Sequence, residues 1–384
     1  MRARRALVTA CVTIMMIMSG AAVAAPADAQ TVPTGDALSR RAVSTLNGWT
    51  AWLAQNKVRG YVGEVGWPRD DPRWSEVAHA WYAAAEAAEL PVTTWVTGEW
   101  AGGQQLANFV RAAPDWTWRT SASSDVMEAH PGTVAAPHGV NVTGPEMGAP
   151  AVDATSTFSN TAVGVLDETY HYDSPATFGY LAAHGVQVVR IPFRWERLQR
   201  SLYAPLDAAE LARLRTLVHA ASSAGLRVVL DMHNYGAYYL ADGTLGVRRA
   251  IGSAQVPVGA FKDAWARIAW AFAGDNSVWA FDLMNEPVNM PATKTRTSAR
   301  LWEQASQSAL DVIRRTGDKR LVIVAGYQWS GMTAWSTHHP VAWIRDSARN
   351  TMYEAHQYWN SDNSGVYLSY DEELARAEVA LAGR

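Results

Sequence analysis

An apolar run in the second half of the chain ends abruptly on the tripeptide Asn285-Glu286-Pro287. The run, residues 278–284, is brief and bounded by helix-breaking residues, which favours a buried strand of a parallel sheet. Glu286 would then follow the carboxyl end of a strand, where α/β barrels hold their chemistry, and it could donate a proton to a substrate. Taken alone, such a tripeptide more often belongs to a solvated loop or a helix start, so the rest of the chain must decide.

Side chains able to do chemistry also follow other predicted strands. We expect strands at residues 58–64, 92–96, 138–142, 186–191, 226–232, 278–284, 321–325 and 351–355. If helices alternate with them, all strands run in one direction and their carboxyl ends open on one face. The side chains at those ends are Glu64, Trp95, Asn141, Arg190, His233, Asn234, Asn285, Glu286, His356 and Tyr358. Two carboxylates with an arginine and two histidines on one rim exceed what stability requires, although a buried ion pair for Arg190 and core positions for the histidines stay open.

The elements that position these side chains follow from helical spacing of apolar residues between the strands. We expect helices at residues 37–55, 72–90, 175–184, 207–224, 258–273, 298–316, 341–348 and 371–382. Eight strands alternating with helices predict an α/β fold, a (β/α)8 TIM barrel, built as one domain from residues 30–384. No period persists between residues 102 and 137, and we interpret this stretch as a surface connector.

The first residues have the pattern of a secretory signal peptide. A basic start, Met1-Arg2-Ala3-Arg4-Arg5, precedes an apolar stretch that ends in small residues. We expect cleavage near residues 24–29 and export of the mature protein, with an uncleaved membrane anchor as the alternative. The one cysteine, Cys11, lies inside this segment. The mature protein should therefore contain no disulfide, no thiolate metal site and no cysteine nucleophile.

The composition points towards carbohydrate. The chain contains 18 tryptophans, and a flat indole face suits a ligand such as a sugar ring that also needs hydrogen bonds. No cluster of Lys and Arg outside the signal segment could follow a phosphate backbone, which argues against a nucleic-acid partner. Five further tryptophans follow strand ends and could either line a sugar cleft or belong to the core: Trp67, Trp100, Trp195, Trp329 and Trp359.

Several motifs coincide with these strand ends. They are Val188-Val189-Arg190-Ile191-Pro192, Asp231-Met232-His233-Asn234, Met284-Asn285-Glu286-Pro287, Ala355-His356-Gln357-Tyr358, Gly63-Glu64-Val65-Gly66 and Trp95, with Gly139-Val140-Asn141-Val142 as a first strand. As a set they resemble glycoside hydrolase family 5, the cellulase family of clan A. The resemblance covers nearly the whole mature chain, and the set is far more specific than any one motif.

The order of the motifs departs from the family. There the nucleophile strand and the tryptophan strand come seventh and eighth, after the acid/base strand, whereas here Glu64 and Trp95 come first. The resemblance therefore implies a circular permutation in which strands 7 and 8 of the usual order open the chain and residues 102–137 join the usual termini. Such a change alters one loop connection and leaves the packed core alone. A rearranged gene is the alternative origin of this order.

The resemblance also implies roles. Glu286 would act as general acid and then as base, and Glu64 as nucleophile, in a retaining double displacement. Their carboxyl groups should then lie about 5–5.5 Å apart, whereas about 6.5 Å or more would indicate inversion. Arg190 would keep Glu64 ionised, and Tyr358 and His356 would orient it.

The remaining candidates would bind or position the sugar. By the same resemblance Asn285 would donate to the sugar 2-hydroxyl, His233 would contact the substrate or a neighbouring residue, and Trp95 would be the sugar platform. Asn141 and Asn234 join them as binding or positioning residues.

These points together predict a secreted, retaining endo-glycosidase that hydrolyses β-1,4-glucan without metal or cofactor. Its partner would be a β-linked polysaccharide or oligosaccharide. We expect a monomer that binds no nucleic acid and, once the signal is removed, no membrane. Hydrolysis of mannan, xylan or another β-glucan by the same family stays an alternative. A rival of another class is a catalytically silent carbohydrate-binding protein with a separate module reaching to about Trp118.

Overall fold

The computed structural model describes residues 35–382, and eight parallel strands in it close into a barrel. They are β1 (Gly60–Gly66), β2 (Val92–Thr97), β5 (His138–Val142), β7 (Val188–Phe193), β8 (Arg227–Met232), β11 (Ala280–Asp282), β12 (Leu321–Ala325) and β13 (Thr351–Tyr358). The ring closes because β1 pairs with both β13 and β2, and β2 pairs in turn with β5. The predicted (β/α)8 barrel is confirmed.

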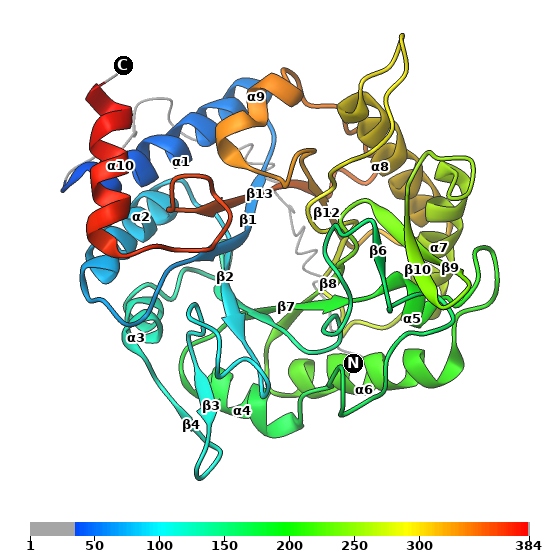
Figure 1. The fold of residues 1–384 in the computed structure, drawn as a ribbon, viewed down its shortest axis with the longest axis horizontal. Coiled ribbons are helices and arrows are strands. Elements are labelled where there is room, and N and C mark those ends of the chain that lie inside the picture. Colours follow the sequence, from blue (N-terminus) through cyan, green and yellow to red (C-terminus); the bar gives the residue numbers. More distant parts are fainter. Residues whose placement is uncertain (1–34, 383–384) are drawn as a thin grey trace, which may run out of the picture.

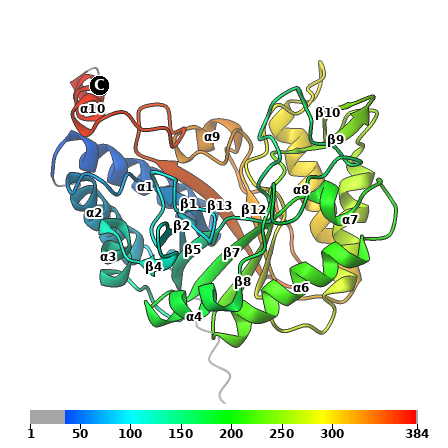
Figure 2. The same cartoon turned by 60° about the horizontal axis from the view of Figure 1, so that its bottom comes forward.

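Helices surround the strands (Figure 1). The longer ones are α1 (Ala37–Asn56), α2 (Arg73–Ala87), α3 (Ala122–Ala129), α4 (Pro175–Ala183), α6 (Ala208–Ser223), α7 (Val258–Ala271), α8 (Ser298–Arg315) and α10 (Tyr370–Ala382). Short elements lie in the connections: β3 (Val110–Ala112), β4 (Thr117–Arg119), β6 (Thr155–Ser156), α5 (Trp195–Leu198), β9 (Ala237–Asp242), β10 (Leu245–Ala250), η1 (Met332–Ala334) and α9 (Trp335–His338). Strands β6, β10 and β9 form a small antiparallel sheet, and β9 and β10 lie beside the barrel (Figure 2).

Local sequence explains the first helix well. The side chain of Asp36 accepts a hydrogen bond from the Ser39 amide at 2.9 Å, which caps the amino end of α1. Its buried residues, which include Leu38, Leu46 and Trp49, recur at three- and four-residue intervals and face the barrel. The helix ends at Lys57, whose φ of +55° is left-handed.

Helices α1 and α10 lie side by side, although one opens and the other closes the described chain (Figure 1). The Tyr370 hydroxyl at the start of α10 donates to the Asp36 carboxylate at 2.5 Å. Helix α1 also packs against β13, because Nε2 of Gln357 donates to the Ala42 oxygen at 2.9 Å and the Trp52 ring lies 5.3 Å from that of Tyr353.

The helix predicted at residues 341–348 is wrong. This stretch has no regular structure, because side chains elsewhere accept its amide hydrogens. The Tyr353 hydroxyl accepts from the amides of Trp343 and Ile344 at 2.9 and 2.7 Å, and Asn56 accepts from the Ala342 amide at 2.8 Å. The helical turns of this connection come earlier, in η1 and α9.

The connector at residues 102–137 is more ordered than its composition indicates. It contains the antiparallel pair β3 and β4 and the helix α3, which begins with a capping box between Ser121 and Ser124. The sequence analysis named no helix or strand in this stretch, so it missed these three short elements. Its proposed role in joining the usual termini stays a prediction.

Two predictions concern the amino-terminal segment and the membrane. The expected signal peptide, including Cys11, lies outside the described residues. Between residues 35 and 382, no helix combines the length and the apolar character that crossing a membrane would need.

Register in the barrel depends on one close approach between strands. A Cβ added at Gly139 in β5 would lie 1.7 Å from the backbone oxygen of Val188 in β7. Gly139→Ala should therefore lower the free energy of unfolding by at least about 1–3 kcal/mol, as overpacking does.

Urea denaturation measures this change in the free energy of unfolding. The control is Gly48→Ala in α1, where the added carbon meets nothing within 4 Å and should stabilise by roughly 0.5–1 kcal/mol. Equal effects of the two variants would contradict the strand pairing.

Candidate active site

The two predicted glutamates meet at the carboxyl end of the barrel. Glu64 lies in β1, is 4% exposed and stands in register with His356 of β13. Glu286 lies in the loop after β11 with a left-handed φ of +44°, and 14% of its side chain is exposed. One oxygen of each glutamate and one ring nitrogen of His356 all lie within 4.8 Å of one another. The barrel thus brings together carboxylates that are remote in sequence.

Both oxygens of Glu64 accept hydrogen bonds. Nη1 of Arg190 donates to Oε1 at 3.1 Å, and the Tyr358 hydroxyl donates to Oε2 at 2.7 Å. A guanidinium and a hydroxyl that donate to the two oxygens of one carboxylate fix its orientation. The structure therefore places Glu64 at the predicted strand end with both oxygens hydrogen-bonded, and its role as nucleophile stays a prediction.

His356 links the two glutamates to a third. Nδ1 lies 2.8 Å from Oε1 of Glu286 and 3.5 Å from Oε2 of Glu64, and Nε2 lies 3.2 Å from Oε1 of Glu354. Burial opposes a charged ring, but the charges of Glu64, Glu286 and Glu354 outweigh it and raise the pKa of His356 well above its usual value. The imidazolium then donates to a carboxylate on each side.

Glu286 has a different environment from Glu64. Burial raises its pKa to about 7, the negative charge of Glu64 adds to this rise, and the hydrogen bond from His356 opposes it. A carboxyl group with this pKa holds a proton near neutral pH and can give it up. The surroundings of the two carboxyl groups therefore differ, and those of Glu286 raise its pKa.

His233 forms the next contact along the rim. Its Nδ1 lies 2.6 Å from Oδ2 of Asp231, and its Nε2 lies 3.2 Å from the Asn285 amide nitrogen and 3.1 Å from the Tyr235 hydroxyl. Burial lowers the pKa of His233 to about 4, so the ring is neutral. We assign the proton to Nδ1, facing Asp231, since Nε2 can then accept from Asn285. The ring stacks on Trp95 with centroids 5.8 Å apart.

The three predicted asparagines have different surroundings. Oδ1 of Asn285 and Oδ1 of Asn141 each accept from Arg190 at 2.9 Å, so both belong to the cluster. Asn234 does not. Its Oδ1 accepts from the Trp195 amide at 2.8 Å and its amide donates to Glu196 at 2.8 Å, which fastens the loop after β8 to α5.

Three buried carboxylates in the cluster were missed by the sequence analysis. Asp231, Asp282 and Glu354 are all 0% exposed. Arg190 approaches them with Nη1 at 3.1 Å from Asp231 and Nε at 2.8 Å from Asp282 and 3.3 Å from Glu354. A signal was present, because Asp231 and Glu354 each precede a site histidine by two residues and so share its face of the strand.

The negative charge of the three buried carboxyl groups is offset by the Arg190 guanidinium and by protons that some of these carboxyl groups keep. Burial disfavours the guanidinium, yet Asp231, Glu354 and Asp282 more than offset this and raise the pKa of Arg190 above its ordinary value. Burial raises the pKa of Asp231 to about 7 and raises that of Asp282 well above its usual range. Some of these carboxyl groups therefore keep a proton when the protein is folded.

The tryptophans that follow strand ends divide between core and surface. Trp67, Trp195 and Trp359 are buried, and Trp67 stacks on Trp359 with centroids 5.2 Å apart. Trp329 is partly exposed, and its ring lies 5.9 Å from Tyr235, which contacts His233. Trp100 is 37% exposed. Only the last two of these five can meet a ligand.

The residue types of Glu64, Glu286 and His356 would also suit a metal ion. Both ring nitrogens of His356 face carboxylates, however, and the ring is protonated, whereas a metal ligand must be a neutral imidazole. We therefore interpret the three side chains as a proton-transfer cluster.

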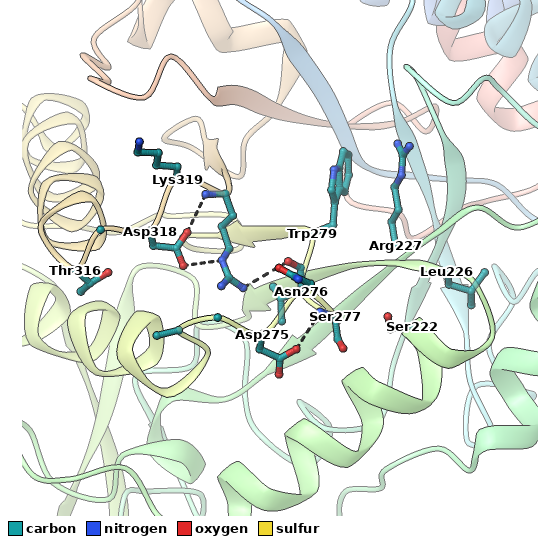
Figure 3. A pocket seen from close by; sticks show the side chains of 15 residues that line it. Ser222, Leu226, Arg227, Asp275, Asn276, Ser277, Trp279, Thr316, Asp318 and Lys319 are labelled. Carbon is teal, nitrogen blue, oxygen red and sulfur yellow. Dashed lines mark hydrogen bonds and ion pairs between the residues drawn. The ribbon is translucent and has the colours of Figure 1, made fainter.

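A separate pocket of about 620 Å³ lies at the other end of the barrel (Figure 3). It is lined by residues that precede or begin strands, among them Arg227 at the start of β8, Trp279 before β11 and Arg320 before β12. The guanidinium of Arg227 lies over the Trp279 ring, 5.2 Å from its centroid. Because the strand carboxyl ends are remote from this pocket, it does not contain the glutamate pair.

A family model for cellulases (glycosyl hydrolase family 5) matches residues 147–378. The chain belongs to this family. The matched segment includes Arg190, Asn285 and Glu286, whereas Glu64 and Trp95 precede it. Family 5 membership therefore rests on strands β7 to β13, and the barrel adds β1, β2 and β5 to them.

Curated relatives and solved structures agree with family 5. An endoglucanase of Neurospora crassa is 33% identical over 193 residues, which are 50% of this chain and 44% of that protein. A probable endo-beta-1,4-glucanase B of Aspergillus niger is 28% identical over 211 residues, 54% of this chain and 58% of that protein. The chain thus spans about half the length of the curated relatives it matches.

Among solved structures, the endoglucanase Cel5A of Pseudomonas stutzeri with cellobiose is 34% identical with a TM-score of 0.51, covering 60% of this chain and 62% of that one. An endo-beta-1,4-glucanase of Xanthomonas axonopodis pv. citri has the same identity and TM-score and covers 64% of this chain and 73% of its own.

The raised pKa of Glu286 predicts a pH-dependent cost in stability. The folded protein keeps a proton up to about pH 7, whereas an unfolded glutamate loses it near pH 4.3. The unfolded state therefore binds fewer protons between these values, and the wild type loses stability as the pH rises through this window. Glu286→Gln removes the titration. Its stability relative to the wild type should rise between pH 4 and pH 8 by on the order of 3 kcal/mol.

Urea denaturation at a series of pH values measures this difference. The control is Glu76→Gln, an exposed position on α2. A flat difference between Glu286→Gln and the wild type across pH 4–8 would show that Glu286 titrates normally.

Proposed function

We propose that the protein is a retaining endo-β-1,4-glucanase with Glu286 as acid/base and Glu64 as nucleophile. The observation that carries this is the approach of the two carboxyl groups within 4.8 Å, with a raised pKa on Glu286 and a hydrogen-bond donor on each oxygen of Glu64. That approach suits the narrow spacing of retaining enzymes, since inverting enzymes need about 6.5 Å or more to admit a water molecule.

In the first step the bond from the anomeric carbon to the leaving oxygen breaks. Glu286 gives its proton to that oxygen, and a Glu64 oxygen forms an ester bond to the carbon. In the second step Glu286, now ionised, takes a proton from water, whose oxygen attacks the same carbon and releases Glu64. The two inversions together retain the β configuration. The second step returns the proton to Glu286 and the negative charge to Glu64, so the site is restored.

The coupling between the glutamates assists both steps. The charge of Glu64 is one cause of the raised pKa of Glu286. When Glu64 becomes an ester, that charge disappears and the pKa of Glu286 falls, which suits a base. Tyr358 and Arg190 remain to receive Glu64 as an anion when the ester is cleaved.

The substrate is inferred from the rim and the relatives. Trp95 offers an aromatic face beside His233, and the amide of Asn285, oriented by Arg190, can donate a hydrogen to a sugar hydroxyl. The names of the relatives include endoglucanase and endo-beta-1,4-glucanase, which favours β-1,4-glucan over mannan or xylan. The amino-terminal signal pattern supports secretion.

We further infer that the family order is circularly permuted. In a closed ring every strand has the same neighbours whichever one comes first, so the strand order alone does not decide. Support comes from the family match, which begins at residue 147 and leaves the strands of Glu64 and Trp95 in front of it. The packing of α10 against α1, and of α1 against β13, also supports it, because a cut in the connection between the neighbouring strands β13 and β1 would leave its two halves side by side.

Loss and chemical rescue of the nucleophile test the proposed function. Glu64→Ala should lower kcat on cello-oligosaccharides by several orders of magnitude, because no ester can form. Azide should restore part of the rate by attacking in the space left by Glu64, yielding a product of inverted configuration. The control is Glu303→Gln, another buried glutamate on α8 that pairs with His339 and Arg300 and should keep its activity.

Wild-type protein that hydrolyses no β-linked glycan would refute the enzyme and favour the carbohydrate-binding rival. Full activity of Glu64→Ala would leave the enzyme but exclude Glu64.

A further inference from the structure

The β3–β4 hairpin is a feature that the catalytic cluster does not use. It spans residues 110–119, lies outside the segment matched by the family model and extends away from the barrel (Figure 1). Between its strands stands Trp116, which is 57% exposed. Three exposed tryptophans are found among residues 35–382: Trp100, Trp116 and Trp270. An indole placed at the end of a projecting hairpin cannot be explained by packing.

The hairpin is rigidly attached. Trp118, next to its tip, stacks on Tyr180 of α4 with centroids 5.4 Å apart and an interplanar angle of 20°. Arg119 pairs with Asp115 across the turn at 2.8 Å. Trp116 has a left-handed φ of +55°, unusual for a residue with a large side chain. Its backbone is held there by Nε of Arg111, which donates to the Trp116 oxygen at 2.8 Å.

A chain of contacts joins Trp116 to a second exposed indole. Nη1 of Arg111 also pairs with Glu99 at 3.0 Å, and the same Glu99 oxygen lies 3.1 Å from Nε2 of His171. The His171 ring stacks under Trp100 with centroids 5.0 Å apart and an interplanar angle of 10°. Arg111 and Glu99 therefore fix the backbone of one exposed tryptophan and the stacking partner of the other.

This surface begins near the rim of the active site. Trp100 follows β2, the strand that carries Trp95. The charged groups around the two indoles, Asp115, Arg111 and Arg119, are at least partly exposed. Flat indole faces bordered by hydrogen-bonding groups are what a sugar chain requires, because its rings have apolar faces and hydroxyl edges.

We propose that Trp116 and Trp100 form a second, non-catalytic binding surface for β-glucan, which holds the protein on insoluble cellulose. The inference rests on the proposed function for the choice of polysaccharide. The rigid attachment of the hairpin supports it, since a preformed aromatic surface loses little conformational freedom on binding.

Adsorption to microcrystalline cellulose at low temperature tests this surface, with Glu64→Gln as the background so that no hydrolysis is needed. Adding Trp116→Ala should lower the partition constant at least fivefold, and Trp116→Tyr should restore most of it because a flat ring returns. The matched control is Trp270→Ala, which removes a 66% exposed tryptophan from α7 and should leave adsorption unchanged. In the otherwise wild-type protein, Trp116→Ala should hydrolyse soluble cellopentaose within twofold of the normal rate.

The possible outcomes separate the two proposals. Adsorption that depends on Trp116 without any hydrolysis of cellopentaose would support the surface and refute the enzyme. Hydrolysis with unchanged adsorption of Trp116→Ala would refute the surface and leave the enzyme intact. Equal losses from Trp116→Ala and Trp270→Ala, no adsorption of the parent protein, or adsorption to insoluble mannan alone would each overturn the surface as a β-glucan site.

Discussion

The buried guanidinium of Arg190 is the interaction on which both barrel and active site depend. It is 0% exposed and projects from β7 into the barrel, where it meets carboxylates carried by β1, β8, β11 and β13. It also donates to Asn141 on β5 and to Asn285 after β11. A charge removed from water costs several kcal/mol, and surrounding carboxylates must offset that cost. Four of the barrel strands therefore supply a carboxylate to one guanidinium, which joins the packing of the barrel to the geometry of the site.

The same charge cluster makes two chemically similar glutamates unlike. Glu64 receives hydrogen bonds from Arg190 and Tyr358 on its two oxygens, which fix its orientation. Glu286 stands further from the guanidinium in a buried loop and faces the Glu64 charge, so its pKa rises to about 7. Environment thus gives the two glutamates different partners, as the proposed division into an acid and a nucleophile requires. His356 donates a hydrogen bond to Glu286 through Nδ1 and one to Glu354 through Nε2, so both of its ring nitrogens are engaged by carboxylates.

The sequence predicted the rim better than the layer beneath it. Residues such as Glu64, Arg190 and Glu286 could be found because breakers mark where apolar strands end, and parallel strands bring those ends together. Asp231, Asp282 and Glu354 lie inside strands, where a carboxylate contradicts the apolar pattern and is intelligible only once Arg190 is known to face it. The helix expected at residues 341–348 failed for a related reason, because the Tyr353 hydroxyl that holds this stretch in an irregular conformation belongs to a later strand. Asn234 had the right position in sequence, but its side chain turns towards Glu196, and spacing cannot reveal that direction.

The pairing of Glu286 with a nucleophile at the front of the chain is the central claim, and trapping the glycosyl-enzyme tests it most directly. An activated 2-deoxy-2-fluoro cellobioside slows both steps and allows the ester to accumulate. Peptide mass spectrometry should then find one fluorocellobiosyl group on the peptide that contains Glu64. A label on any other carboxylate, or turnover of a normal substrate with inversion and no trapped ester, would contradict the account.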